Sequence, residues 1–83
     1  MISIVLRNKN EERWIGHAIQ SCIDHFKDPE IIVIDNHSTD RSMDIVRDFC
    51  FSNIKIHTIR DYTPGRALNL GASVASHENI LVL

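Results

Sequence analysis

Residues 30–40 read Glu-Ile-Ile-Val-Ile-Asp-Asn-His-Ser-Thr-Asp, and this stretch decides the fold. Four apolar residues in succession, residues 31–34, are typical of a strand covered on both faces, because a half-exposed strand alternates apolar and polar residues. Turn and cap residues follow from Asp35 to Asp40, so the strand should end at Asp35. Strands of this kind occur in parallel sheets with helices on both faces.

Three other segments have strand patterns: residues 2–6, 54–58 and 79–83. The first and last are apolar runs that favour buried strands, whereas residues 54–58 alternate as expected near a sheet edge. The segments between them have helical periodicity. Helices between strands of this length favour parallel pairing with right-handed crossovers. The sequence therefore predicts an α/β fold of order βαβαβαβ, a three-layer, mostly parallel sheet with strand order 3-2-1-4.

The helices are predicted from their apolar stripes and their boundary residues. The first should run over residues 11–26, with Asn10 as its N-cap and Glu11 and Glu12 in its first turn. Trp14 is expected to lie in the core or to anchor this helix, with base stacking as the alternative. The second should begin near Asp40 or Arg41. Its predicted sheet-facing residues are Met43, Val46, Phe49 and Cys50. The third should open at Pro64, and its predicted inner stripe is Ala67, Leu68, Gly71, Ala72 and Ala75.

Length and composition limit the class of protein. Eighty-three residues with 43% hydrophobic and 24% charged residues are enough for one globular unit. The net charge of −2 is spread along the chain and argues against a nucleic-acid ligand. The apolar runs are far shorter than the roughly 20 residues of a membrane span, and the start lacks the features of a signal peptide, so we expect a cytoplasmic protein. Cys22 and Cys50 have no metal-ligand spacing and are expected to be reduced core residues.

Ligands of such sheets bind beyond the carboxyl ends of the strands, where the winding reverses. This rule selects residues 7–10 and 35–40. A dinucleotide site is excluded because no glycine lies between the first strand and its helix, and no P-loop occurs. A receiver-type signalling domain would need two carboxylates after the first strand, where this chain has Arg7 and Asn8.

Several motifs occur together and in order: Ser3-Ile-Val-Leu, Asn10-Glu-Glu, the segment 32–40, Pro64-Gly-Arg-Ala-Leu-Asn-Leu-Gly-Ala and His77-Glu-Asn-Ile-Leu-Val-Leu. Over the whole chain they resemble the opening of a family-2 glycosyltransferase. The resemblance implies that residues 1–83 are a single partial domain, the Rossmann-like, nucleotide-sugar-binding half of a glycosyltransferase-A fold. It also implies a nucleoside diphosphate sugar as donor and glycosyl transfer by the complete enzyme.

The resemblance assigns base and ribose contacts to Arg7, Asn8, Glu11 and Asp35. Many relatives have a second aspartate where this chain has Asn36, and Arg66 is a candidate phosphate contact near Leu68, where relatives often have arginine. Arg7 and Lys9 replace the small or aromatic residues that relatives often have there, and their positive charges have two possible roles: to meet the donor diphosphate that the resemblance implies, or to form ion pairs with Glu11 and Asp35. Asp35 has an alternative role as a cap of the turn that follows it.

The resemblance further implies that the complete enzyme uses a divalent cation, Mg²⁺ or Mn²⁺, whose ligands and whose catalytic base follow the fourth strand and lie outside this chain. No catalytic residue is assigned within residues 1–83. The alternative is that this chain is a non-catalytic α/β assembly module or an inactive truncated fragment. In that case, an exposed fourth strand is expected to pair with another copy.

Overall fold

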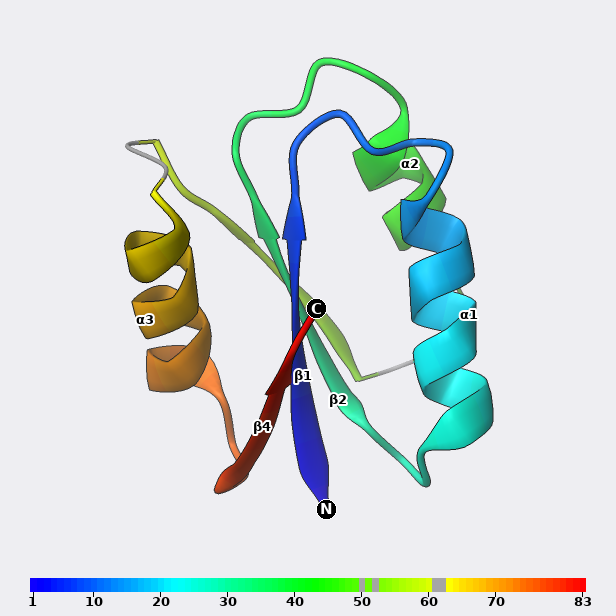
Figure 1. Ribbon diagram of the computed structural model, residues 1–83. Helices are drawn as coiled ribbons and strands as arrows, with labels where there is room; N and C mark the ends of the chain where they lie inside the picture. Colours follow the sequence, from blue (N-terminus) through cyan, green and yellow to red (C-terminus); the bar gives the residue numbers. More distant parts are fainter. Residues whose placement is uncertain (50, 52, 61–62) are drawn as a thin grey trace.

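A computed structural model describes residues 1–49, 51, 53–60 and 63–83, and it has the predicted order of elements (Figure 1). All four strands are parallel and form one sheet of order β3-β2-β1-β4, as predicted. In the pairing of β1 with β2, Asn8 lies opposite Asp35 at the carboxyl ends. The elements are β1 (Ile2–Asn8), α1 (Ile15–His25), β2 (Glu30–Asp35), α2 (Ser42–Arg47), β3 (Ile54–Thr58), α3 (Pro64–Val74) and β4 (Asn79–Val82).

Helices cover both faces of the sheet: α1 and α2 lie on one side and α3 on the other (Figure 1). Successive side chains of a strand point to opposite faces, so a strand between two helical layers must be apolar at every position. All six residues of β2 are buried. One core cluster joins Ile4, Leu6, Ile31 and Val33 to α1 and α2, and the other joins Val5, Ile32 and Ile34 to Ala67.

The start of α1 differs from the prediction. The helix begins at Ile15 rather than Glu11, Asn10 is not its N-cap, and no acidic residue lies in its first turn. The backbone of Asn10 has a φ of 52°, and its side chain accepts hydrogen bonds from the loop after β2 instead. Because residues 10–14 are held by that loop, Trp14 becomes the capping residue and is 42% exposed, not anchored in the core as predicted.

The second helix begins at Ser42, close to the predicted start. Val46 is buried in the core, and Met43 and Phe49 pack against it as predicted. The prediction for Cys50 lies outside the described residues. Cys22 is a free, buried thiol whose pKa is raised by burial, in agreement with its predicted role as a core residue.

The inner stripe of α3 is rotated by comparison with the prediction. Ala67 and Gly71 are buried, but Leu68 is 42% exposed and Ala72 is exposed, while Leu70 and Val74 pack on the core in their place. The reason is the close approach at Gly71, where a Cβ atom would lie 2.7 Å from Cγ1 of Val5. With Gly71 pressed against β1, the flank of the helix that carries Leu68 cannot face the sheet.

The fourth strand is less buried than predicted. Ile80 and Val82 are 38% and 37% exposed, and only Leu81 packs against the core. The helix α3 lies nearest to β1 and β2, and the core cluster on its side of the sheet includes no residue of β4. Among the described residues, β4 pairs with β1 alone, which leaves its outer edge open.

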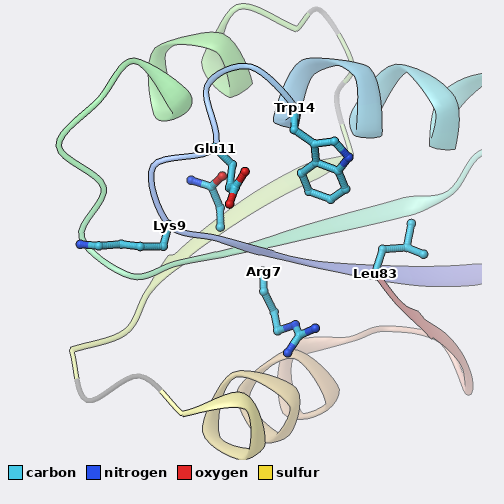
Figure 2. Close-up of a pocket in the computed structure, with 6 residues that line it drawn as sticks. Arg7, Lys9, Glu11, Trp14 and Leu83 are labelled. Carbon is cyan, nitrogen blue, oxygen red and sulfur yellow. The ribbon is translucent and has the colours of Figure 1, made fainter.

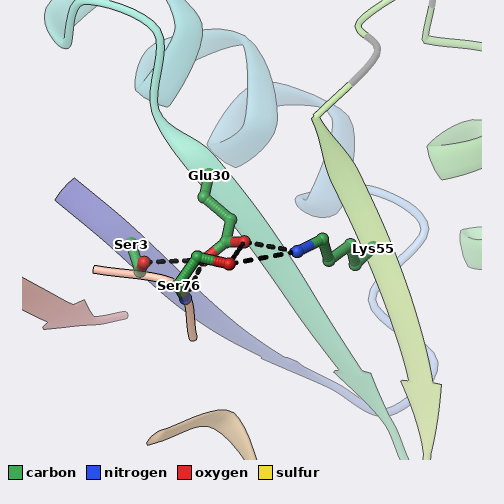
Figure 3. Close-up of polar contacts among 4 residues, drawn as sticks. All are labelled: Ser3, Glu30, Lys55 and Ser76. Atoms are coloured by element: carbon green, nitrogen blue, oxygen red, sulfur yellow. Dashed lines mark hydrogen bonds and ion pairs between the residues drawn. The ribbon is translucent and has the colours of Figure 1, made fainter. Parts of the chain in front are cut away.

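The buried carboxylate of Glu30 links β1, β2, β3 and the segment before β4 at the amino-terminal end of the sheet (Figure 3). Glu30, at the start of β2, is 1% exposed and pairs with Lys55 of β3. It accepts hydrogen bonds from the Ser3 hydroxyl at 2.7 Å and from the Ser76 amide and hydroxyl at 2.7 and 2.8 Å. Burial by itself raises the pKa of Glu30, but the bonds from Lys55, Ser76 and Ser3 outweigh it and lower the pKa from 4.5 to about 2.

In the described part of the chain, no helix is long and apolar enough to cross a membrane.

Candidate functional site

Two loops meet at the carboxyl ends of β1 and β2. The Asn10 side chain accepts from the amides of Thr39 and Asp40 at 2.7 and 3.3 Å, and the Asn10 amide donates to the Ser38 hydroxyl at 2.9 Å. The Glu12 amide donates to the Asp40 carboxylate at 3.0 Å. These bonds join side chains to backbone amides, so they fix the course of both loops.

Backbone conformation supports the same arrangement. Asn10 and His37 have φ values of 52° and 48°, in the left-handed region where asparagine and histidine are enriched among non-glycine residues. The Lys9 ammonium donates to the His37 carbonyl at 3.2 Å. Burial acts to raise the pKa of Asp40, but hydrogen bonds from Ser42 and from the Glu12 amide hold it below its usual value. The paired loops thus form one polar platform at the end of the sheet.

Asp35 lies beneath this platform and is 4% exposed. Its Oδ1 atom accepts from Asn8 Nδ2 at 2.9 Å and from the Ser38 hydroxyl, and its Oδ2 atom accepts from the Ser38 amide at 3.1 Å. Both carboxylate oxygens are therefore engaged by the protein. The role of Asp35 in this arrangement is to orient Asn8 and the turn at Ser38.

A pocket of about 500 Å³ opens at the end of β1. Figure 2 shows Arg7 extending to the α3 side of β1, with Glu11 and Trp14 on the α1 side. The pocket therefore crosses the end of the strand at the point where the sheet changes winding, the place expected for ligands of this fold. Its lining residues are Arg7, Asn8, Lys9, Glu11, Trp14 and Leu83.

The pocket brings together cations, a carboxylate and an indole. Within the described residues, no ion pair joins Arg7 or Lys9 to Glu11 or Asp35, so the ion pairs considered for these two cations are not observed. Two buried polar atoms have no hydrogen-bond partner in the described part of the chain, Nε of Arg7 and Oδ1 of Asn8. Such atoms are uncommon in native structures, and here both belong to residues that line the pocket.

Three predicted site residues, Arg7, Asn8 and Glu11, line the pocket together. Asp35 and Asn36 do not line it: Asp35 bonds to Asn8 from behind, and the Asn36 amide donates to the Asn8 carbonyl at 3.0 Å. Arg66 is exposed in the first turn of α3 and is also absent from the lining.

Sequence reasoning did not name Leu83 as a pocket residue, and for Trp14 it favoured core or helix anchoring over base stacking. Trp14 heads an apolar stripe, and that pattern favoured a core position. The signal that would have found it is the polar run from Arg7 to Arg13, which is long enough to delay the helix until Ile15. Leu83 reaches the pocket because its amide donates to the Val5 carbonyl and so extends the pairing of β4 along β1.

No group of three or more histidine, cysteine, aspartate or glutamate side chains that could hold a metal ion occurs in residues 1–49, 51, 53–60 and 63–83. The described residues therefore do not fit a divalent-cation site.

Comparison with known proteins agrees with the fold. The model of the family "Glycosyl transferase family 2" matches residues 3–83. A protein of Haemophilus influenzae described as an uncharacterized glycosyltransferase is 29% identical over 87 residues, which cover 100% of this chain and 35% of that protein.

Two solved structures of S. aureus TarS, residues 1–349, are similar to this chain. The first has a TM-score of 0.88 at 25% identity, and the second, a complex with UDP, has a TM-score of 0.87 at 25% identity. Each match covers 99% of this chain and 26% of the TarS chain. The likeness confirms the predicted Rossmann-like, glycosyltransferase-A type of sheet. The chain spans about a third or less of the length of these relatives.

Proposed function

Because the chain belongs to glycosyl transferase family 2, we propose that the pocket at the end of β1 binds the nucleotide of a nucleoside diphosphate sugar. In the complete enzyme, the glycosyl group of that donor would be transferred to an acceptor. The observation that carries the proposal is the pocket itself: two cationic side chains, an exposed indole and a buried amide gather where this type of sheet binds its ligands. The UDP complex of the similar TarS structure supports the choice of a nucleotide.

The residues that line the pocket indicate where the base and the diphosphate of the nucleotide bind. Trp14 offers an aromatic face on the α1 side of β1, and bases stack on such faces. Arg7 lies on the α3 side, and its guanidinium is suited to phosphate oxygens, which it binds through paired hydrogen bonds. The Lys9 ammonium adds a second positive charge. We therefore place the base near Trp14 and the diphosphate near Arg7.

Titration calorimetry of the 83-residue chain with UDP tests this proposal. Replacing Trp14 with alanine removes the stacking face and should weaken UDP binding roughly fivefold or more, because base stacking contributes about 1–3 kcal/mol. The matched control is Leu68→Ala, since Leu68 is likewise 42% exposed but lies outside the pocket. It should leave the UDP affinity unchanged. A folded wild-type chain that shows no saturable binding of UDP would overturn the proposal.

The complete enzyme is proposed to use Mg²⁺ or Mn²⁺ to neutralise charge on the departing diphosphate, with ligands beyond these 83 residues. We also propose a cytoplasmic location, and the free, buried thiol of Cys22 supports it because unpaired cysteines are usual in a reducing compartment.

A second candidate function is assembly through β4. The two sheet edges differ: β3 carries Lys55 and His57, whereas residues 79–82 of β4 carry no charge and expose Ile80 and Val82. Charged side chains protect edges from pairing, so the unprotected edge supports pairing with a second copy. Sedimentation at high concentration should then show a dimer that Val82→Lys disrupts. A monomer at all concentrations would contradict this candidate.

A further inference from the structure

We propose that Asn8 is the residue that selects the nucleobase, and that Asp35 sets the direction of its selectivity by fixing which atom of the Asn8 amide faces the ligand. The inference rests on the proposed nucleotide-binding function and adds a substrate class to it. The class consists of nucleotides whose base presents a ring N–H group, such as uracil, over those with an unprotonated ring nitrogen at that place, such as cytosine.

Asp35 fixes the orientation of the Asn8 side-chain amide. A carboxylate accepts hydrogen bonds and donates none, so the group of Asn8 that faces Asp35 at 2.9 Å must be Nδ2. The same nitrogen lies 3.0 Å from the Ser38 hydroxyl, which in turn donates to Asp35. Oδ1 of Asn8 therefore points away from both partners.

The Oδ1 atom of Asn8 is buried and lacks a hydrogen-bond partner in the described part of the chain. Asn8 itself is 2% exposed and lines the pocket. A buried acceptor that no protein group satisfies is unfavourable, and a ligand N–H that reaches it removes the penalty. A ligand that offers another acceptor at this point makes the penalty worse. The site therefore distinguishes a donor from an acceptor.

A ligand reaches Asn8 past the side chain of Glu11. Glu11 is exposed, lines the same pocket and makes no side-chain hydrogen bond within the described residues. Its side chain is therefore able to change rotamer when a ligand enters, as interface side chains commonly do. A base that stacks on Trp14 and displaces the Glu11 side chain approaches the end of β1, where Asn8 lies.

Asp35 controls which atom of the Asn8 amide faces the pocket. In Asp35→Asn, the Ser38 backbone amide still requires an acceptor where Oδ2 now stands, so the new amide must place its oxygen there. Its nitrogen then occupies the position of Oδ1 and faces Asn8. The Asn8 amide must turn over to offer its oxygen, which presents Nδ2 to the pocket. The hydroxyl of Ser38 is able to rotate and complete the reversed network.

Calorimetric titration of the 83-residue chain with UDP and with CDP tests the inference. The wild-type chain should bind UDP at least tenfold more tightly than CDP, and Asp35→Asn should abolish or reverse that preference. The control is Asp44→Asn, which removes the same charge from an exposed position on α2 and should keep the wild-type ratio. The ratio within each protein is the readout, so a general loss of affinity does not imitate the effect.

Three results would overturn the inference. Equal affinities for UDP and CDP in the wild-type chain would leave nucleotide binding in place but remove the role of Asn8. An unchanged preference in folded Asp35→Asn would show that Asp35 does not set the amide. Absence of binding to either nucleotide would overturn the proposed function together with the inference. If Asp35→Asn does not fold, the wild-type ratio alone decides, with Asn8→Leu expected to lose the preference.

Discussion

The buried carboxylate of Glu30 should make the stability of this chain depend on pH in the acid range. Its pKa is lowered from 4.5 to about 2, which means that the folded state favours the ionised form. A depressed carboxyl pKa contributes stability that is present above pH 4.5 and lost as the pH falls through 2. The drop corresponds to about 3 kcal/mol, because one pKa unit is about 1.4 kcal/mol.

The perturbation is Glu30→Gln, which keeps the size of the side chain and removes the charge that Lys55 and Ser76 bind. At pH 7 the variant should lose about 3 kcal/mol of unfolding free energy. For a domain of this size, such a loss lowers the melting temperature by roughly 12–24 °C. The matched control is Glu78→Gln, since Glu78 is exposed. It should change the unfolding free energy by less than about 0.5 kcal/mol.

Urea unfolding followed by circular dichroism at several pH values between 7 and 2.5 measures the effect. The wild-type chain should become less stable between pH 4.5 and 2.5, while the variant should lose less over that range, so the two curves converge in acid. Parallel curves, or a variant as stable as the wild type at pH 7, would refute the reasoning. If Glu30→Gln does not fold at pH 7, the convergence is tested with Lys55→Gln, which removes the partner whose side chain is 44% exposed.

Two further predictions concern packing and loop structure. Gly71→Ala should destabilise the chain by about 1–3 kcal/mol in urea unfolding, because the added Cβ would lie 2.7 and 2.8 Å from the Val5 methyl carbons. In the control variant Gly65→Ala, the added Cβ meets nothing within 4 Å and should cost no packing energy. Equal losses of stability in the two variants would contradict the explanation. Asn10→Gly keeps the left-handed φ of 52° but removes the acceptor of two loop amides, and should cost about 1–2 kcal/mol with weaker UDP binding. An Asn10→Gly chain of wild-type stability and affinity would show that these bonds do not hold the site.

The strands were predictable because their signal is local and strong. A run such as residues 31–34 is apolar at every position only if both faces are covered, and the edge position of β3 followed from its alternation. The strand order also predicted that ligands bind at the end of β1, since the winding of the sheet changes there. For this reason the rule selected residues 7–10, of which Arg7, Asn8 and Lys9 line the pocket, whereas Glu11, which also lines it, was named only through the family resemblance.

The loops were not predictable, because their structure depends on partners far away in the sequence. Asparagine is a residue type that commonly caps helices, which is why Asn10 was predicted to be an N-cap. Its side chain instead accepts hydrogen bonds from amides 29 and 30 residues away, and the helix starts later as a result. The exposure of Trp14 follows from that displacement. Asp35 shows a second limit: its position at the strand end was predicted, but its two oxygens are used by Asn8 and Ser38, and only coordinates reveal that.

The hydrogen bonds between the two loops also bear on how the chain folds. They connect residues 28 to 30 positions apart, so they form only after β1 and β2 have paired across an intervening helix. Contacts of this separation are slow to form, because the entropy of closing the chain must be lost first. Intermediates that contain helices but an incomplete sheet would lack the recognition surface. Nucleotide affinity would then report on completed folding, and a saturating ligand would draw the population towards the native state by mass action.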